Sequence, residues 1–356
     1  MKIALVSNMY PSKQDPVFGI FVKNTESLLA ENGIQTISKA VIKGRKKSLG
    51  KILSYLKFYF DIFLVFLNPK VKLIYVHFPL QSSLILLVLK KLSNKKVILN
   101  IHGSELNKNS FFYKYFTNLL KISDFVIVPS TYYKNRLIDE LNTDNSKIYI
   151  FPSGGINKEV FYPLNKTKIR NELNYNTNWF ICSYISTITE QKGWKVYFEA
   201  AILMLEKGLN IKFLIVGNGD NEEVFYKLVK DSKFSDSFIF ESRQQQQNLV
   251  KYFSASNVFI FPTYRKEESL GLVGLESMAC GTPVIGSKLG AIQDYIKNGI
   301  NGFLFEPKNP KDLAKKIEQF YNSDQKDNFS KEALKTAAKF DSKNCSFALA
   351  KKLKEL

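Results

Sequence analysis

The sequence predicts an α/β protein of two doubly wound domains, each with a parallel sheet covered by helices on both faces. Its 356 residues exceed one ordinary hydrophobic core and suffice for two. Apolar runs of strand length alternate with helical patterns along the whole chain, which is typical of parallel sheets. A segment rich in turn formers, residues 152–163, separates two such series. We therefore expect domains at residues 1–163 and 164–340, and a C-terminal helix at 341–356 that returns to the first domain.

Two series of strands are expected, one in each domain. The first domain opens with a strand at residues 2–8 and a helix at 20–31 that Gly33 closes, and its further strands are expected at 35–42, 72–77, 96–102, 124–129 and 147–151. The strands of the second domain are expected at 179–186, 211–216, 237–240, 258–261, 283–286 and 302–305. Because such sheets bind ligands at the carboxyl ends of their strands, the expected site is the cleft between the two domains.

The composition is that of a folded globular protein, with 45% hydrophobic and 23% charged residues. Cys182, Cys280 and Cys345 have no metal-ligand spacing, and their sparse, odd count favours a reducing compartment without disulfides. The short apolar run at the N-terminus indicates a buried first strand and not a signal peptide. We therefore expect the protein to stay in the cytoplasm.

The charge balance is strongly basic, since 51 Lys and Arg residues against 32 Asp and Glu residues give +19. Such a surplus attracts nucleic acid, a lipid surface or phosphorylated small molecules, although a lysine-rich surface that only aids solubility has the same balance. No nucleic-acid-binding module is recognisable in the sequence, so no nucleic-acid partner is expected.

Residues 52–67 are strongly apolar and rich in aromatics, interrupted by Lys57 and Asp61 and flanked by Lys51 and Lys70. The segment is too short and too charged to span a bilayer. It can lie on an anionic membrane as an amphipathic helix, or it can pack against the first sheet. Packing is the favoured interpretation, because helices of such folds have one apolar face anyway.

The segment 268–284, ESLGLVGLESMACGTPV, carries the most information about chemistry. It follows the strand expected at 258–261, so a helix begins here at the ligand edge of the second sheet. Gly271 permits close backbone approach, and free N–H groups at a helix start bind phosphate. Glu268 and Glu276 are eight positions apart, about 12 Å along an ideal helix. That separation is too large for one acid–base pair and suits two carboxylates that hold different parts of a long ligand.

This segment resembles the donor-site signature of retaining GT-B glycosyltransferases, E-x7-E, and within them the fourth sequence family, the glycosyl transferases group 1. Further matches to that family follow in order along nearly the whole chain. They are Phe18-Gly19-Ile20-Phe21-Val22, His102-Gly103-Ser104-Glu105, Gly154-Gly155-Ile156-Asn157 with Phe161 and Pro163, Lys192-Gly193, Gly217-Asn218-Gly219 and Gly290-Ala291-Ile292-Gln293-Asp294. The resemblance implies two Rossmann-like domains facing across a cleft.

The resemblance also implies a role for each matched residue. Glu276 would bind the ribose hydroxyls of a nucleotide, and Glu268 would hold hydroxyls of the transferred sugar. Lys192 would neutralise the leaving diphosphate, and His102 would contact the sugar from the first domain. The implied catalytic residues are thus Glu268, His102 and Lys192. The implied donor contacts are Gly19, Thr187, Lys192, Arg243, Ser269, Leu270, Gly271, Leu272, Val273 and Glu276.

The implied activity is retaining transfer of a hexose from a nucleoside-diphosphate sugar, taken to be a UDP-sugar, by front-face displacement. The expected acceptor is a lipid-linked saccharide or a polysaccharide of the cell surface, met at the inner face of the plasma membrane, where a basic protein binds anionic lipid. Acceptors that are soluble small molecules or proteins stay open. The metal-binding motif Asp-x-Asp is absent from the sequence, so neither a metal nor a cofactor is expected.

Thr187 departs from the family pattern, because many members have an arginine there that grips the diphosphate. Gly154 likewise stands where the family has an interdomain asparagine. Thr187 keeps open a second function, that of a catalytically silent nucleotide-sugar-binding partner of another transferase. His77 is expected to be structural, and residues 244–247, four glutamines, are interpreted as a solvated helix start. Arg265 and Lys266 are either surface charges or donor contacts.

Overall fold

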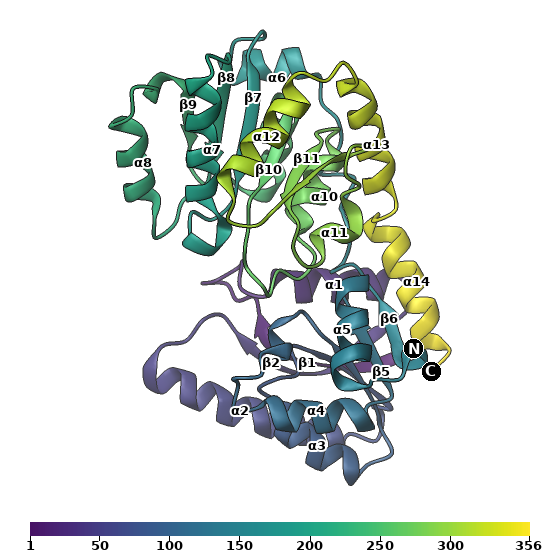
Figure 1. Ribbon diagram of the computed structural model, residues 1–356. Coiled ribbons are helices and arrows are strands. Elements are labelled where there is room, and N and C mark those ends of the chain that lie inside the picture. The colour runs from purple at the N-terminus through teal and green to yellow at the C-terminus, as the bar shows by residue number, and fades with distance from the viewer. The chain divides into compact units, whose positions relative to one another are not determined.

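The structure is a computed structural model that describes residues 1–356, except for the side chain of Ser48. The chain forms two compact units, each with its own sheet (Figure 1). The first unit comprises Met1–Gly155 and Ser342–Leu356, and the second comprises Ile156–Asp341. The first domain was expected to end at residue 163 and the second at residue 340. In the structure the corresponding ends of the two units are Gly155 and Asp341.

The first sheet, within the described residues, has six parallel strands in the order β2-β1-β3-β4-β5-β6. The strands are β1 (Lys2–Tyr10), β2 (Gln35–Lys43), β3 (Leu73–His77), β4 (Lys96–Asn100), β5 (Phe125–Val128) and β6 (Ile148–Ile150). Alternate residues enter two different cores, Val6 on one face and Leu5 on the other. Both faces are therefore buried, as parallel sheets require.

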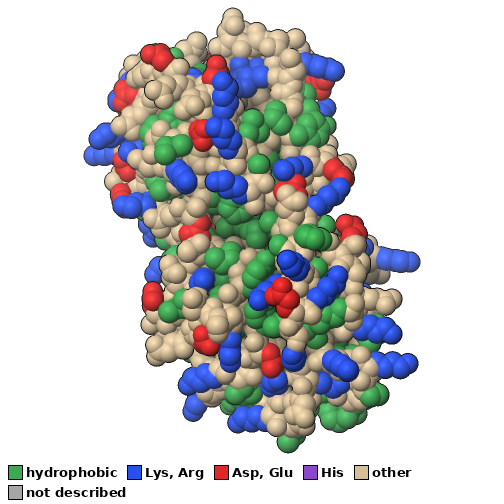
Figure 2. Space-filling view, turned by 90° about the vertical axis from the view of Figure 1, so that its right-hand side faces the viewer, with side chains coloured by type: hydrophobic (Ala, Val, Ile, Leu, Met, Phe, Trp, Pro, Cys, Tyr) green, Lys and Arg blue, Asp and Glu red, His purple; other side chains and the backbone are tan. Residues whose placement is uncertain are grey.

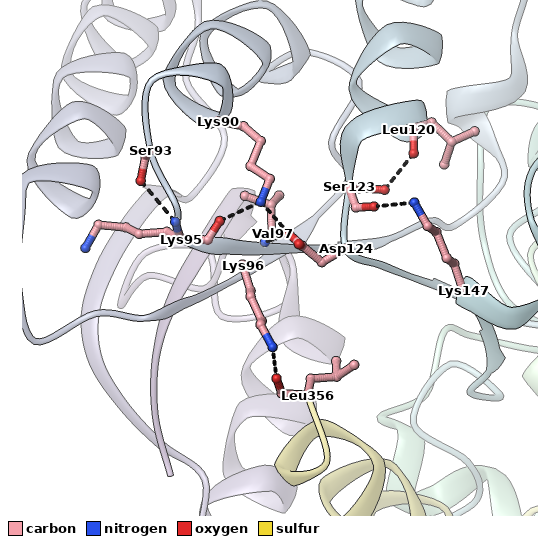
Figure 3. Close-up of polar contacts among 10 residues, drawn as sticks. All are labelled: Lys90, Ser93, Lys95, Lys96, Val97, Leu120, Ser123, Asp124, Lys147 and Leu356. Atoms are coloured by element: carbon pink, nitrogen blue, oxygen red, sulfur yellow. Dashed lines mark hydrogen bonds and ion pairs between the residues drawn. The ribbon is translucent and has the colours of Figure 1, made fainter.

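Helices cover both faces of this sheet. On one face lie α2 (Ser48–Leu67), α3 (Ser83–Lys91), α4 (Tyr113–Ile122) and α5 (Thr131–Leu141). On the other face lie α1 (Ile20–Glu31) and α14 (Ser342–Lys354), whose Leu349 and Leu353 are buried in the same core as Leu29. Asn32 Nδ2 donates to Ser346 Oγ at 3.3 Å, and Lys96 Nζ donates to the carbonyl oxygen of Leu356 (Figure 3). The C-terminal helix thus completes the core of the first unit.

Helix α2 contains the strongly apolar segment of residues 52–67. Phe58, Ile62 and Val65 are buried in the core against the first sheet. The favoured interpretation, a helix packed on the sheet, is confirmed for this side of α2. The other side of the helix is also apolar but is exposed.

The second sheet, again within the described residues, has six parallel strands in the order β12-β11-β10-β7-β8-β9. The strands are β7 (Phe180–Ile185), β8 (Ile211–Val216), β9 (Phe238–Glu241), β10 (Val258–Phe261), β11 (Val284–Ser287) and β12 (Gly302–Phe305). Its helices are α6 (Lys166–Glu172), α7 (Trp194–Glu206), α8 (Glu222–Lys230), α9 (Leu249–Ala255), α10 (Leu272–Ala279), α11 (Ile292–Tyr295), α12 (Pro310–Tyr321) and α13 (Lys326–Ala338). Successive strands run outward in both directions from the adjacent pair β7 and β10, which makes this pair the topological switch point.

The predicted fold class, α/β with two Rossmann-like domains, is confirmed. Each predicted strand matches an observed one to within two residues at either end. The basic composition is visible at the surface: in Figure 2, Lys and Arg side chains are spread over both units, with Asp and Glu side chains between them.

Candidate functional site

The second unit has a cavity of about 320 Å³ at the carboxyl ends of β7, β8 and β10, the edge where doubly wound sheets bind ligands. Among the residues that line it are Thr187, Lys192, Arg243, Glu268, Gly271, Leu272 and Val273, all predicted from the sequence. Ser186, Asn218 and Gln244 also line it, and no site role was predicted for them from the sequence. The structure therefore gathers most of the predicted donor contacts of this unit around one cavity.

Helix α10 begins beside the cavity, directly after Gly271. Gly271 has a φ of 75°, and a Cβ atom there would lie 2.6 Å from Cε1 of Phe261. Its carbonyl oxygen accepts a hydrogen bond from the hydroxyl of Tyr295 at 3.1 Å. Glycine is thus required for both conformation and space. The first N–H groups of α10, which have no partner within the helix, lie at residues that line the cavity and suit an anion.

Lys192 and Glu268 form an ion pair at the cavity wall. Lys192 Nζ lies 2.7 Å from Glu268 Oε2, and both side chains are less than a quarter exposed. Gly193 follows with a φ of 77°, and a Cβ atom there would lie 2.0 Å from the carbonyl oxygen of Pro262. This close contact with the end of β10 fixes the turn that carries Lys192. The cation and the carboxylate that the resemblance assigned to diphosphate and sugar are therefore direct neighbours.

Thr187, the departure from the pattern that the resemblance implies, is exposed and lines the cavity. Its carbonyl oxygen accepts hydrogen bonds from the Tyr184 hydroxyl at 3.3 Å and from the Thr189 N–H at 2.9 Å. Arg243 lines the same cavity from the segment after β9. Arg265 and Lys266 are exposed and are not among the described residues that line it. Arg243 is thus the arginine that this cavity contains.

Glu276 lies in the second turn of α10 and is buried, outside the lining of the cavity. Its Oε1 accepts a hydrogen bond from Gln246 Nε2 at 2.8 Å. Burial raises the pKa of Glu276 to about 7, and the hydrogen bond from Gln246 acts in the opposite direction. Gln246 belongs to the glutamine run, where the structure has a short 3₁₀ turn, Gln246–Asn248, before α9. Gln246 is itself exposed, so the interpretation of that run as a solvated helix start is confirmed, and the contact with Glu276 adds to it.

The predicted residues Ser269 and Leu270 also lie outside the lining of the cavity. Leu270 is buried, and its side chain belongs to the interior of the second unit. In the first unit, Gly19 precedes α1 with a φ of 68°, and a Cβ atom there would lie 2.5 Å from the carbonyl carbon of Met9. The glycine loop thus lies between β1 and α1, and α1 matches the helix expected at residues 20–31.

His102 of the first unit lies directly after β4, where its ring is held by other aromatic side chains. His102 Nε2 lies 3.1 Å from His77 Nδ1, and the ring stacks on Phe78 with a centroid separation of 4.1 Å. Burial lowers the pKa of His102 to about 3 and lowers the pKa of His77 as well. Both imidazoles are therefore neutral near pH 7, and one donates to the other. His77 is structural, as expected, but it also positions His102.

Glu105 is a further residue of this loop that was not assigned a role from the sequence. It is fully buried, and its Oε2 accepts from the N–H groups of His102 at 3.1 Å and Gly103 at 2.9 Å. Burial raises the pKa of Glu105 to about 7. The carboxyl group thus fixes the backbone that presents His102. Its place within His102-Gly103-Ser104-Glu105 was visible in the sequence, but its burial was not.

Comparisons with known proteins agree with the two-unit architecture. Residues 165–337 match the family model described as glycosyl transferases group 1, and residues 21–155 match that of glycosyltransferase family 4. The two matches lie one in each unit. Together they leave only residues 1–20, 156–164 and 338–356 outside.

Three curated relatives illustrate the sequence similarity. An uncharacterised glycosyltransferase of Methanocaldococcus jannaschii is 28% identical over 293 residues, 80% of this chain and 76% of that protein. A D-inositol 3-phosphate glycosyltransferase of Pseudarthrobacter chlorophenolicus is 29% identical, over 52% of this chain and 44% of that protein. The capsular polysaccharide biosynthesis glycosyltransferase CapM of Staphylococcus aureus is 28% identical, over 60% of this chain and 57% of that protein.

Solved structures share the fold over the whole chain. Sucrose-phosphate synthase from Thermosynechococcus elongatus superimposes with a TM-score of 0.80 at 20% identity, covering 100% of this chain and 98% of its own. Anabaena HepE in complex with UDP has a TM-score of 0.78 at 17% identity and covers 100% of both chains. The same Anabaena protein has also been solved with UDP-glucose. At these identities the likeness shows the fold.

Proposed function

Because this chain belongs to the group 1 glycosyltransferases of GT-B fold, we propose that it moves a hexose from a UDP-sugar to a cell-surface glycan precursor with retention of configuration. The acceptor we propose is a lipid-linked saccharide or a growing polysaccharide. That it is an enzyme acting on nucleotide sugars follows from the family, while donor, acceptor and stereochemistry are the proposal. The capsular polysaccharide enzyme among its relatives and the UDP complexes of the Anabaena protein motivate these choices.

The observation that carries the proposal is the Lys192–Glu268 pair beside the start of α10. A departing UDP gains negative charge on its diphosphate, and Lys192 with the N–H groups of α10 would stabilise that charge. Glu268 would face the positive charge that develops on the sugar. In the proposed front-face displacement, the bond from the sugar's anomeric carbon to the leaving phosphate oxygen breaks as the bond to the acceptor oxygen forms. The acceptor proton passes to the leaving phosphate.

The test is transfer from UDP-glucose, UDP-galactose and their N-acetyl counterparts to lipid-linked saccharides, with the linkage read by proton NMR. We expect an α-linked product from an α-configured donor. A β-linked product would contradict retention, and transfer only from non-uridine donors would contradict the choice of nucleotide. Transfer to soluble polyols or sugar phosphates instead would follow the inositol and sucrose-phosphate relatives and overturn the proposed acceptor.

Thr187 favours one other function, a silent binder of nucleotide sugar that assists another transferase. Its hydroxyl offers a single neutral hydrogen bond where an arginine would offer a charged, bidentate contact. Arg243 in the same cavity supplies a second cation beside Lys192, which supports activity. Slow hydrolysis of the donor by the purified protein separates the two functions, because a silent binder releases no sugar.

We expect transfer to proceed without a divalent metal. The reason is that Lys192, Arg243 and the start of α10 provide positive charge for the diphosphate within one cavity. The measurement is the transfer rate in EDTA, compared with the rate in added magnesium or manganese. Activity that EDTA abolishes and manganese restores would refute this expectation.

Affinity for UDP is expected to rise with pH if Glu276 binds the ribose. The carboxyl pKa of about 7 means that Glu276 is mostly protonated near pH 6 and mostly ionised near pH 8. The ionised form accepts hydrogen bonds from two hydroxyls, so binding should strengthen over this interval. Calorimetric titration with UDP should show the rise in the wild type, whereas Glu276→Gln, which has no ionisable group, should bind more weakly with a flatter profile.

The raised pKa of Glu276 also determines how its contribution to the free energy of unfolding changes with pH. Because folding raises the pKa of Glu276 above its usual value, its contribution to stability is largest at low pH and is lost as pH rises through about 7. Glu276→Gln should therefore gain stability relative to the wild type at pH 8. If UDP affinity depended on pH in Glu276→Gln just as it does in the wild type, the pH dependence of UDP binding would belong to another group.

A lipid-linked acceptor would bring the enzyme to the inner face of the plasma membrane as a peripheral protein, which we include in the proposal. No helix within the described residues has the length and apolarity needed to cross a bilayer. Association would then have to occur at the protein surface.

A further inference from the structure

We propose that the first unit docks on an anionic lipid bilayer through the exposed side of α2 and α3, with the basic cavity beside α2 holding lipid headgroups. The observations are an apolar stripe without a partner among the described residues, the charge around it and this cavity. An anionic bilayer would thus be a partner of the transferase proposed above. This inference rests on the proposed function only for the location of the acceptor.

The apolar stripe runs the whole length of α2. Its members repeat at intervals of three and four residues, which places them on one side of a helix within an arc of about 120°. They are between 42% and 70% exposed, unlike the core-facing side of the same helix. The stripe comprises Leu49, Ile52, Leu53, Leu56, Phe60, Phe63, Leu64 and Leu67.

Helix α3 extends this surface. It packs against α2, and Tyr59 of α2 donates through its hydroxyl to the carbonyl oxygen of Gln81, just before α3. Leu84 and Val88 of α3 and Leu92 directly after it recur every four residues and are exposed. In Figure 1, α2 and α3 lie on the same face of the first sheet. Exposed apolar surface of this extent marks a binding surface on a folded protein.

The charge of the segment that contains the stripe identifies the partner. Residues 43–104, which contain α2 and α3, hold 12 Lys and Arg residues and one acidic residue, Asp61, which gives 12 − 1 = +11 of the chain's +19. A second copy of the chain would bring an equal positive charge to the contact. Nucleic acid has no apolar layer for the stripe to enter. An anionic bilayer offers both a negative surface and an apolar interior.

Some of these lysines are already engaged within the first unit. Lys90 Nζ pairs with Asp124 at 2.7 Å, and Lys96 Nζ donates to the carbonyl oxygen of Leu356 (Figure 3). Lys95 Nζ donates to the carbonyl oxygens of Asn68, which follows α2, and of Val71. Their structural roles leave the lysines around α2 itself to meet an anion.

A cavity of about 380 Å³ between β2 and α2 borders the stripe. Lys39, Lys43, Lys46 and Lys57 line it, together with Asp61. Lys39 pairs with Glu26 and Lys57 pairs with Asp61, but Lys43 and Lys46 have no acidic partner among the described residues. Lys57 lies one turn after Leu53, which places the cavity directly beside the stripe. Two unpaired ammonium groups there suit the phosphate of a lipid headgroup.

Vesicle sedimentation tests the inference without any sugar donor. Wild-type protein should bind phosphatidylcholine vesicles that contain phosphatidylglycerol and bind pure phosphatidylcholine far less, and salt should weaken the binding. The variant Leu53→Gln, Leu56→Gln, Phe60→Gln should lose about a hundredfold in vesicle affinity. Lys43→Gln with Lys46→Gln should lose about thirtyfold on the acidic vesicles.

Matched controls separate this surface from general effects. Val224→Gln, Tyr226→Gln and Phe347→Gln remove exposed apolar side chains elsewhere, and Lys311→Gln with Lys315→Gln removes the same charge from α12. Both control variants should bind as the wild type does. Circular dichroism and donor hydrolysis should be unchanged in all variants, so a failed transferase assay leaves the membrane result readable.

Three outcomes would overturn the inference. They are equal binding to both kinds of vesicle, undiminished binding by the stripe variant, and a wild-type dimer in sedimentation velocity that the stripe variant dissociates. The last would assign the stripe to a second copy of the chain. If the protein bound vesicles as expected but transferred no sugar, the result would support this inference and contradict the proposed function.

Discussion

Replacing Lys192 with alanine is expected to lower turnover about a hundredfold, equivalent to about 3 kcal/mol of transition-state stabilisation. Lys192 lies at the cavity wall, and its ammonium group is held 2.7 Å from Glu268. The negative charge of the departing diphosphate develops as the sugar leaves, so the loss should appear in kcat more than in affinity for UDP. Single-turnover rates with saturating donor measure it.

Lys195→Ala is the matched control, because Lys195 is exposed on α7 three residues further on and does not line the cavity. It should leave turnover unchanged. A Lys192→Ala enzyme of near-normal rate would show that the phosphate is held elsewhere, and the donor site would have to be moved.

Thr187 provides a second arm of the same experiment. Thr187→Arg adds a guanidinium to the same cavity, and in the Lys192→Ala background it should recover part of the lost rate. Arg243→Ala tests the other source of charge. If Arg243 already takes the part of the missing arginine, Arg243→Ala should cost turnover, and Thr187→Arg should restore it. If Thr187→Arg raised the rate in neither the Lys192→Ala nor the Arg243→Ala enzyme, Thr187 would have no more than a space-filling role.

The sequence was sufficient to predict the architecture because the apolar periodicity of parallel strands is strong and local. β8 and β10 match their predicted ranges in full, and α1 matches residues 20–31. Glycine positions were equally informative, since Gly271 and Gly193 need positive φ and close approach whatever surrounds them.

What the sequence did not reveal depends on contacts between distant segments. Gln246 lies 30 residues from Glu276, and nothing in a run of glutamines indicates which of them meets a buried carboxyl group. The contact between His77 and His102 likewise joins the ends of two strands, and it appears only once β3 and β4 are paired.

Helix α2 shows a different limit. Its hydrophobic pattern was interpreted as a single apolar face. That face was expected either to pack against the first sheet or to lie on a membrane. The helix is apolar on two sides, so burial of Phe58 and exposure of Phe60 come from the same run of residues. Only the packed structure separates the two sides.

Glu268→Gln is expected to lower turnover by about a hundred- to a thousandfold while UDP affinity changes little. The carboxylate would face the positive charge that develops on the sugar, and the amide has the same shape without the charge. Glu267→Gln is the control, since it removes the neighbouring carboxylate, which does not line the cavity. Equal losses in the two variants would point to a general electrostatic effect and contradict a specific role for Glu268.

The ion pair itself permits a sharper test, because Glu268 has two distinguishable ways to act. If it only holds Lys192 in place, then removing it from a Lys192→Ala enzyme should cost nothing more, and the double variant should turn over as fast as Lys192→Ala alone. If Glu268 acts on the sugar while Lys192 acts on the diphosphate, the double variant should be slower than either single variant. We expect the second result, since the two charges would meet opposite charges of the same transition state. A double variant no slower than Lys192→Ala would reduce Glu268 to a positioning residue and leave the sugar's developing charge without a partner in this cavity.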